Sequence, residues 1–299
     1  FIMRTISFFI CLSSVFFSHS LRSTSGLNIL LTNDDGYTSE GIKAASFALV
    51  EAGHRVTIVA PKTQQSATGM KITLGSLSAE QHAAEVWSVS GSPADAVMIG
   101  LNNVFGKEVP DLVISGANFG QNLGSNVMLS GTVGAASMAV FMGVPAIALS
   151  VGLDLGESTG SPEPYVSTIA AFPEAAEFLV AVVEQYTNNP AVIPKGELLN
   201  INYPVRAPAR PAILASRVSN IGGFVVNHEF RTEGSSTINT IVSLANGSDG
   251  LENSDVAAFS KGNITISFLK PDWNGSQKNF ARLVELATAI QKSRKPEAR

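Results

Sequence analysis

Short runs of hydrophobic residues alternate with segments of helical periodicity over the first two thirds of the chain. Apolar runs typical of buried strands occupy 27–31, 55–60, 85–90, 111–115, 145–150 and 198–202. Helical spacing predicts helices over about 39–53, 93–101, 131–142 and 168–187. Continuously apolar strands that alternate with helices are typical of a mostly parallel sheet covered on both faces. The pattern therefore predicts the α/β fold class.

The last third of the chain has a different pattern. Short β-like segments, such as 264–268, are scattered between about 210 and 270, and a final helix is predicted over 280–291. We expect one domain over 21–299, in which residues 210–270 form a β-rich arm or subdomain.

The N-terminus has the pattern of a secretory signal peptide. Arg4 provides a positive charge, residues 6–17 are apolar, and residues 18–20 form an acceptable cleavage site. The apolar run is short for a membrane span, although a retained signal anchor is the alternative. We expect a signal peptide at 1–20 and a secreted or vacuolar protein. The three Asn-x-Ser/Thr sequons that agree with this route are Asn246, Asn263 and Asn274.

Composition narrows the possible functions. Hydrophobic residues make up 45% of the chain and charged residues only 15%, which excludes a disordered, highly charged protein. The formal net charge of −4 gives no electrostatic reason to expect nucleic-acid binding. The single cysteine, Cys11, lies within the predicted signal peptide, so an intrachain disulfide and a thiolate zinc site are both excluded.

Polar segments follow three of the predicted strands. Asp34 and Asp35 follow the first, and adjacent carboxylates repel each other unless a cation lies between them. A plain turn is the alternative. Ser66 lies in a polar segment after the second strand, where an ordinary loop is the alternative. Asn118 lies in a glycine-rich segment after 111–115, which lets the backbone approach a ligand closely, with a long surface loop as the alternative.

A helix start completes the set of candidate residues. Ser130, Gly131 and Thr132 open the predicted helix 131–142 and present backbone N–H groups suited to a phosphate, with a simple N-cap as the alternative. In a parallel α/β sheet, segments that follow strands meet at the carboxyl edge, where ligands bind. Carboxylate, hydroxyl and amide oxygens gathered there suit Mg²⁺ or Mn²⁺. A divalent metal beside a phosphate site predicts metal-assisted hydrolysis of a phosphoester.

With these segments the chain resembles the SurE (survival protein E) family of metal-dependent 5'/3'-nucleotidases and acid phosphatases, in a secreted eukaryotic-type form. The matching segments lie, in the family's order, at 30–36, 59–61, 65–66, 91–95, 110–124, 130–133, 200–204 and 254–266. The resemblance implies a three-layer α/β/α Rossmann-like sandwich, with a β-rich C-terminal arm that forms homodimers or homotetramers.

The resemblance also implies roles for single residues. The implied metal ligands are Asp34, Asp35, Ser66 and Asn118, of which Asp34, Asp35 and Asn118 are also expected to be catalytic. The implied phosphate-binding turn is Ser130, Gly131 and Thr132. The implied substrates are nucleoside monophosphates or other small phosphate monoesters, with Mg²⁺ or Mn²⁺ as the cofactor.

The chain departs from the family pattern near the expected phosphate site. Ser125 and Asn126 stand where acidic residues are common, and Leu129 stands where an aromatic residue or histidine is common. None of these removes an implied ligand, but they leave the substrate preference open.

Two other functions are compatible with parts of the pattern. A dinucleotide-binding oxidoreductase shares the alternation of strands and helices, although Asn-Asp-Asp-Gly follows the first strand in place of a glycine-rich fingerprint. A catalytically inactive secreted glycoprotein on the same fold is the second alternative.

Overall fold

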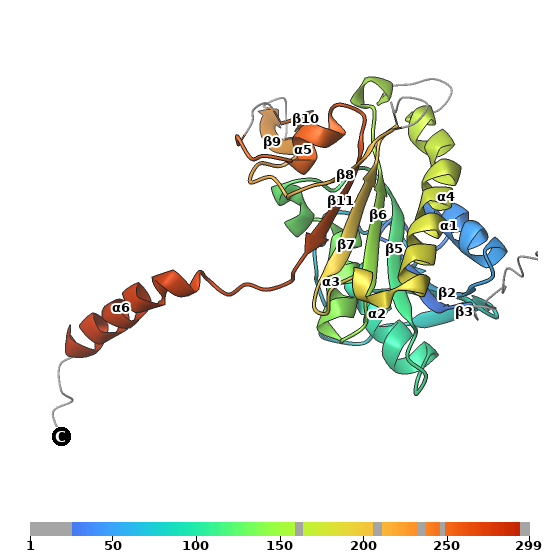
Figure 1. Ribbon diagram of the computed structural model, residues 1–299, viewed down its shortest axis with the longest axis horizontal. Coiled ribbons are helices and arrows are strands. Elements are labelled where there is room, and N and C mark those ends of the chain that lie inside the picture. The colour runs from blue at the N-terminus through green and yellow to red at the C-terminus, as the bar shows by residue number, and fades with distance from the viewer. Residues whose placement is uncertain (1–25, 159–163, 206–210, 232–236, 246–248, 294–299) are drawn as a thin grey trace, which may run out of the picture.

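The computed structural model describes residues 26–158, 164–205, 211–231, 237–245 and 249–293 (Figure 1). Its helices are α1 (Glu40–Glu51), α2 (Pro93–Ile99), α3 (Gly131–Phe141), α4 (Val166–Asn188), α5 (Asp255–Phe259) and α6 (Phe280–Ser293). Its strands are β1 (Asn28–Thr32), β2 (Arg55–Pro61), β3 (Ala79–Ala83), β4 (Val86–Val89), β5 (Leu112–Phe119), β6 (Ala146–Val151), β7 (Leu198–Tyr203), β8 (Ile213–Ala215), β9 (Phe224–Arg231), β10 (Thr237–Leu244) and β11 (Ile264–Leu269). The predicted signal peptide and Asn246 lie outside the described residues.

One large sheet forms the centre of the molecule. In the described part of the chain its strand order is β3-β4-β2-β1-β5-β6-β7-β11-β8. The strands from β4 to β7 run parallel to one another, whereas β3 is antiparallel to β4 and β11 is antiparallel to β7. The mostly parallel sheet predicted from the apolar runs is therefore confirmed.

Helices cover both faces of this sheet and give three layers (Figure 1). On one face α1 and α4 bury residues such as Ile42 and Leu179 against the strands, and on the other α2 and α3 bury Val97 and Ala135. Helix α4 is long and apolar enough to cross a membrane, but its apolar side packs against the sheet in the first of these cores. The α/β/α sandwich is thus confirmed.

Two elements differ from the sequence pattern. Strand β5 continues to Phe119, four residues beyond its predicted end, because Gly116 adopts a φ of 139° and the strand resumes pairing with β6 at Asn118 after a register shift. Asn118 is therefore on a strand end and not in a loop. Strand β3 was missed because all of its residues are exposed and it carries no apolar run.

The region expected as the arm divides into parts. Strands β8 and β11 belong to the large sheet, whereas β9 and β10 form a separate antiparallel hairpin. The hairpin lies at the end of the molecule toward which β6 and β7 point, and α6 stands away from the body at the end of an extended segment (Figure 1). Among the described residues, the hairpin and α6 are the elements that extend beyond the three-layer sandwich.

Candidate active site

The turn after β1 carries both aspartates. Asn33 holds it, because its Nδ2 donates to Gly36 O at 2.9 Å and to Ser39 Oγ at 2.8 Å, while Gly36 N donates to Asn33 Oδ1. The segment is therefore a side-chain-supported turn, as one interpretation of the sequence expected. That turn also directs Asp34 into a cavity at the carboxyl edge of the sheet. The segment after β1 is therefore both a turn and a pair of carboxylates at the cavity edge, so the two interpretations of the sequence are compatible.

Asp34 is nearly fully buried, and its carboxylate lies against the first residues of α3. Its Oδ1 accepts a hydrogen bond from Thr132 Oγ1 at 2.7 Å. A Cβ atom at Gly131 would come within 2.8 Å of Asp34 Oδ2, so glycine is required for this approach. Burial raises the pKa of Asp34, while the Thr132 hydroxyl and the N–H groups of Thr132 and Gly131 act in the opposite direction.

Asp35 is held by a different strand. Its Oδ2 accepts a hydrogen bond from the backbone N–H of Phe119 at 2.9 Å. Burial, together with the neighbouring charge of Asp34, raises the pKa of Asp35 to about 7 against the lowering effect of that N–H group. A cation between the two carboxylates would relieve both the repulsion and the cost of burial.

Asn118 presents an oxygen without a partner. Its Nδ2 donates to Gly120 O at 2.6 Å, which fixes the orientation of the amide. Its Oδ1 is buried and accepts no hydrogen bond. A buried carbonyl oxygen of this kind is costly unless a ligand satisfies it, and it lines the same cavity as Asp34.

Ser66 completes the predicted ligand set from an exposed loop. Gln65 N donates to the backbone oxygen of Asp34 at 2.6 Å and ties this loop to the turn after β1. The cavity of about 250 Å³ that Asp34 and Asn118 line is also lined by Ser66 and Ser130. The structure therefore brings these four predicted residues together at one cavity. Asp35, which follows Asp34 in the chain, is not part of its lining, and neither are Gly131 and Thr132.

The donor set fits a hard divalent cation. The described residues contain no group of three or more histidine, cysteine, aspartate or glutamate side chains placed to hold a metal. The set found here has two carboxylates, a hydroxyl and an amide oxygen, all of them oxygen ligands of the type that Mg²⁺ and Mn²⁺ prefer. The unpartnered Asn118 oxygen and the raised pKa values of both aspartates are the observations expected of such a site.

The start of α3 carries the three residues that are predicted to bind phosphate. Ser130 Oγ accepts a hydrogen bond from Val133 N at 3.0 Å and is thus the N-cap, while the Thr132 hydroxyl is bonded to Asp34. Both hydroxyls are therefore engaged within the protein. The N–H groups of Gly131 and Thr132 face Asp34. A phosphate near this helix start would therefore interact mainly with the positive end of the helix dipole.

A polar network behind the cavity was not predicted from the sequence. Asn122 N donates to Asn202 Oδ1 at 2.7 Å, Asn202 Nδ2 donates back to Asn122 O at 3.0 Å, and Asn122 Nδ2 donates to Ser150 Oγ. The fully buried carboxylate of Asp255 accepts N–H groups from Gly124 at 2.8 Å and Ser219 at 2.9 Å. These contacts fasten the glycine-rich segment to β7 and to the C-terminal region. The sequence feature that could have predicted this network is the presence of polar residues, such as Asn202, within otherwise apolar strands.

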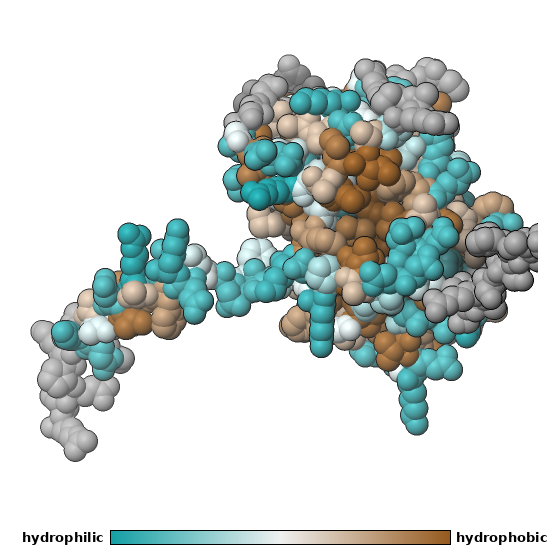
Figure 2. Space-filling model, in the orientation of Figure 1, coloured by the Kyte–Doolittle hydropathy of each residue, from teal (hydrophilic) through white to brown (hydrophobic). Residues whose placement is uncertain are grey.

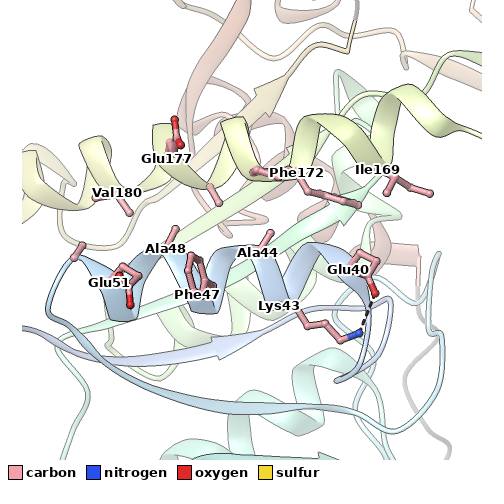
Figure 3. A pocket seen from close by; sticks show the side chains of 13 residues that line it. Glu40, Lys43, Ala44, Phe47, Ala48, Glu51, Ile169, Phe172, Glu177 and Val180 are labelled. Carbon is pink, nitrogen blue, oxygen red and sulfur yellow. Dashed lines mark hydrogen bonds and ion pairs between the residues drawn. The ribbon is translucent and has the colours of Figure 1, made fainter.

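A larger groove lies between α1 and α4, the two helices that cover one face of the sheet (Figure 3). Its volume is about 840 Å³, and its lining is mostly apolar, with the exposed ion pair of Lys43 and Glu40 at one end (Figure 3). It contains none of the buried polar atoms that lack a partner. Its chemistry therefore does not suggest catalysis, and the smaller cavity is the candidate active site.

The two described sequons differ in accessibility. Asn274 is exposed, whereas Asn263 is partly buried and its Nδ2, the atom that a glycan would occupy, donates to Ala258 O at 3.0 Å. Asn274 is therefore better placed for modification than Asn263.

Comparisons with known proteins find a matching family model, named relatives and a similar solved structure. A family model described as "Survival protein SurE" matches residues 29–224. The 5'-nucleotidase SurE of Gloeobacter violaceus is 38% identical over 66% of this chain and 70% of its own length. That of Thermosipho africanus is 41% identical over 60% of this chain and 65% of its own length. The crystal structure of the Sure protein from Aquifex aeolicus superposes with a TM-score of 0.71 at 27% identity, over 87% of this chain and 99% of that one.

Proposed function

The chain belongs to the SurE family, and on that premise we propose that it is a divalent-metal-dependent phosphomonoesterase. Its substrates are nucleoside monophosphates or other small phosphate monoesters. The single observation that carries the metal dependence is the buried, unpartnered Oδ1 of Asn118 in the cavity that Asp34 and Ser66 also line. The relatives named 5'-nucleotidase support the reaction class.

The residues of the candidate active site divide the work of hydrolysis. Asp34, Asp35, Ser66 and Asn118 would hold Mg²⁺ or Mn²⁺. When bound, the cation supplies Lewis acidity to the phosphoryl group and lowers the pKa of a water molecule. Thr132 orients Asp34, and Phe119 N orients Asp35. The start of α3 adds favourable electrostatics for the charge of the phosphate. The bond to the leaving-group oxygen breaks as water adds to phosphorus, giving an alcohol and inorganic phosphate.

The turn after β1 argues against the oxidoreductase alternative. In a dinucleotide-binding fold this turn is glycine-rich and holds the pyrophosphate. Here it carries the carboxylates of Asp34 and Asp35, whose negative charges repel a pyrophosphate.

Phosphate release tests this proposal. The purified chain is assayed with a panel of nucleoside and other monophosphates in Mg²⁺, in Mn²⁺ and in a chelator, across pH. We expect metal-dependent release, and we expect Asp34→Asn to abolish it, because the change removes a charge but keeps the shape. Asp111→Asn is the matched control: Asp111 precedes β5 at the opposite edge of the sheet and accepts a hydrogen bond from Asn28 N.

Two outcomes would contradict the proposal. Full activity of Asp34→Asn would remove the metal assignment. No release by the wild-type chain from any monoester with metal supplied would favour the inactive glycoprotein on the same fold.

We propose further that the protein is a secreted eukaryotic-type member that follows the secretory route to the outside or to the vacuole. The apolar run at 6–17 and the exposed sequon at Asn274 support this route. N-terminal sequencing and glycosidase treatment of the protein from its own source would test it, since we expect a start near residue 21 and a glycan.

The partner that we propose for the protein is a second copy of itself, as a homodimer or homotetramer. Exposed apolar side chains on the hairpin, such as Ile238 and Ile241, and on α6, such as Leu283 and Ile290, support this assignment. Figure 2 shows apolar side chains gathered on α6, which stands clear of the body. Exposed apolar elements of this kind are typical of protein interfaces.

A further inference from the structure

The loop that carries Ser66 does not fix the position of that side chain by itself. This loop, residues 62–78, joins β2 to β3 and contains neither helix nor strand. Ser66 is exposed, its N–H donates to Gln64 Oε1 at 2.7 Å, and its Oγ accepts from Gln64 Nε2 at 2.6 Å. Both bonds lie within the loop. The position of Ser66 relative to the cavity therefore depends on the contacts that fasten the loop to the rest of the molecule.

Two backbone hydrogen bonds fasten the part of the loop nearest the cavity. One is the bond from Gln65 N to Asp34 O, and the other runs from Gly69 N to Leu129 O at 3.0 Å. Helix α3 also packs directly on the loop, because a Cβ atom at Gly134 would come within 2.1 Å of Gly69 O. Each of the two bonds joins neutral groups, and a third fastening comes from α2.

Asp95, in the first turn of α2, holds the loop with both carboxylate oxygens. Its Oδ1 accepts a hydrogen bond from Thr73 N at 2.9 Å, and its Oδ2 accepts one from Thr73 Oγ1 at 2.7 Å. The N-cap Ser92 donates its hydroxyl to Lys71 O and its N–H to Asp95 Oδ2 at 2.8 Å. A Cβ atom at Gly91 would come within 2.5 Å of that Oδ2. The start of α2 is thus built around the carboxylate that holds the loop.

Asp95 retains its charge although it is only 3% exposed. Burial alone would raise the pKa of this carboxyl, but the hydrogen bonds from Thr73 and Ser92 outweigh burial and lower the pKa below its ordinary value. Hydrogen bonds to an ionised acceptor are about twice as strong as those between neutral groups. The bonds from Thr73 to Asp95 are therefore stronger than the neutral bonds at Gln65 and Gly69.

A series of hydrogen bonds connects the segment at Thr73 with Ser66. Lys71 N donates to Thr68 O at 3.2 Å, and Thr68 Oγ1 donates to Gln65 O at 2.8 Å. Gln65 directly precedes Ser66 in the chain. A displacement of residues 71–73 would therefore move Ser66 as well.

We propose that Asp95 is a positioning residue for the metal site, because it holds the loop through Thr73 in the arrangement that places the Ser66 hydroxyl at the cavity. The inference rests on the proposed metal-dependent function, in which Ser66 is a ligand. Asp95 does not line the cavity, so its effect on the cation passes through the loop. Metal affinity should therefore depend on Asp95 only as long as Ser66 is present.

Calorimetric titration with Mn²⁺ tests this role without requiring catalysis. We expect Asp95→Asn to weaken Mn²⁺ affinity about 10-fold, at the lower end of the range for partners that orient metal ligands. Thr73→Val removes one donor to Asp95 and keeps the cap of α2, so it should cause a smaller loss that Thr73→Ser restores. Ser90→Ala is the matched control with unchanged affinity, because it removes a 2.9 Å hydrogen bond from Ser78 N at the end of the loop beyond Thr73.

A double-mutant cycle with Ser66→Ala separates positioning from general support of the fold. Asp95→Asn combined with Ser66→Ala is expected to weaken Mn²⁺ affinity no further than Ser66→Ala alone, because both changes remove the same interaction. Additive losses would overturn the positioning role. Melting temperatures in chelator identify the variants that fold, and Thr73→Val replaces Asp95→Asn in the cycle if the latter does not.

The remaining outcomes separate this inference from the function on which it rests. Wild-type affinity for Mn²⁺ in both Asp95→Asn and Thr73→Val would overturn the role of Asp95 and leave the proposed function in place. A wild-type protein that binds no Mn²⁺ would instead refute the metal-dependent function itself.

Discussion

The hydroxyl of Thr132 donates a 2.7 Å hydrogen bond to Oδ1 of Asp34 and so joins the first turn of α3 to the turn after β1. The two residues lie 98 positions apart. This contact makes the helix start part of the metal site, because it orients the carboxylate that is proposed to hold the cation. The contact uses the hydroxyl of Thr132, whereas the sequence pattern indicated only its backbone N–H group for phosphate.

Replacing Thr132 by valine is expected to weaken metal binding and lower kcat/KM about 10-fold or more, since partners that orient metal ligands contribute to this extent. Valine keeps the shape of the side chain and removes only the donor. Thr132→Ser retains the hydroxyl and is expected to restore most of the loss. Calorimetric titration with Mn²⁺ and steady-state kinetics would measure both effects. Normal metal affinity in the valine variant would show that Asp34 does not need this bond.

The unpartnered oxygen of Asn118 leads to a prediction about stability. Asn118→Leu removes this unpartnered oxygen and also the donor to Gly120 O, so we expect two opposing effects on the melting temperature in chelator. The rise in melting temperature that metal causes in the wild type should disappear, because a ligand is lost.

Asn202→Leu is the comparison variant, for which we expect a loss of stability in chelator but a normal response to metal. Asn202 is fully buried, and both ends of its amide bond to Asn122. Its replacement is expected to cost about 1 to 3 kcal/mol of folding stability in chelator while leaving a metal-induced rise. A metal-induced rise that persists in Asn118→Leu would exclude Asn118 as a ligand.

The pKa of Asp35 predicts how metal-free protein responds to pH. In the folded state this pKa is raised from 3.8 to about 7, so the fold favours the protonated carboxyl. Its contribution to stability is complete below pH 3.8 and is lost as pH rises through about 7. In chelator, the melting temperature should therefore fall between about pH 4 and about pH 7, and Asp35→Asn should flatten this dependence.

Metal should reverse the same dependence. The cation requires the ionised carboxylate, so affinity for Mn²⁺ is expected to rise with pH until Asp35 is deprotonated, and binding near pH 6 should release a proton. Titrations in two buffers of different ionisation enthalpy would measure that proton. Identical pH profiles for wild type and Asp35→Asn would contradict the role of this group.

The exposed apolar face of α6 predicts self-association. Light scattering should give a mass of at least two chains for the wild type, and Leu283→Lys with Ile290→Lys should lower it. Ala289→Lys adds one positive charge away from the face that carries Leu283 and Ile290, and it is the control for each of the two single replacements. A wild-type monomer at micromolar concentration would contradict the proposal, and an unchanged mass in the double variant would move the interface to another surface, such as the hairpin.

Much of the fold follows from sequence periodicity alone. The apolar runs that became β1, β2, β5, β6 and β7 are continuous because both of their faces are buried, and that condition leaves a direct trace in the residues. Elements without a buried face leave no such trace, which is why β3 was not predicted.

The residues of the site also divide into those that the sequence indicates and those that only the structure reveals. Neighbours in the chain, such as the adjacent carboxylates Asp34 and Asp35 and the N-cap Ser130, are visible in the sequence because their chemistry depends on local backbone. The carboxyl ends of parallel strands meet at one edge, so the sequence also indicated that Asn118 would lie near them.

Only the tertiary structure decided which side chains touch. The bonds from Thr132 to Asp34 and from Phe119 to Asp35, and the placement of Phe224 beside the cavity, join segments many residues apart. Periodicity constrains the direction and burial of each element but not the pairing of side chains between elements. That pairing, and with it the unpartnered oxygen of Asn118, is set by how the layers pack in three dimensions.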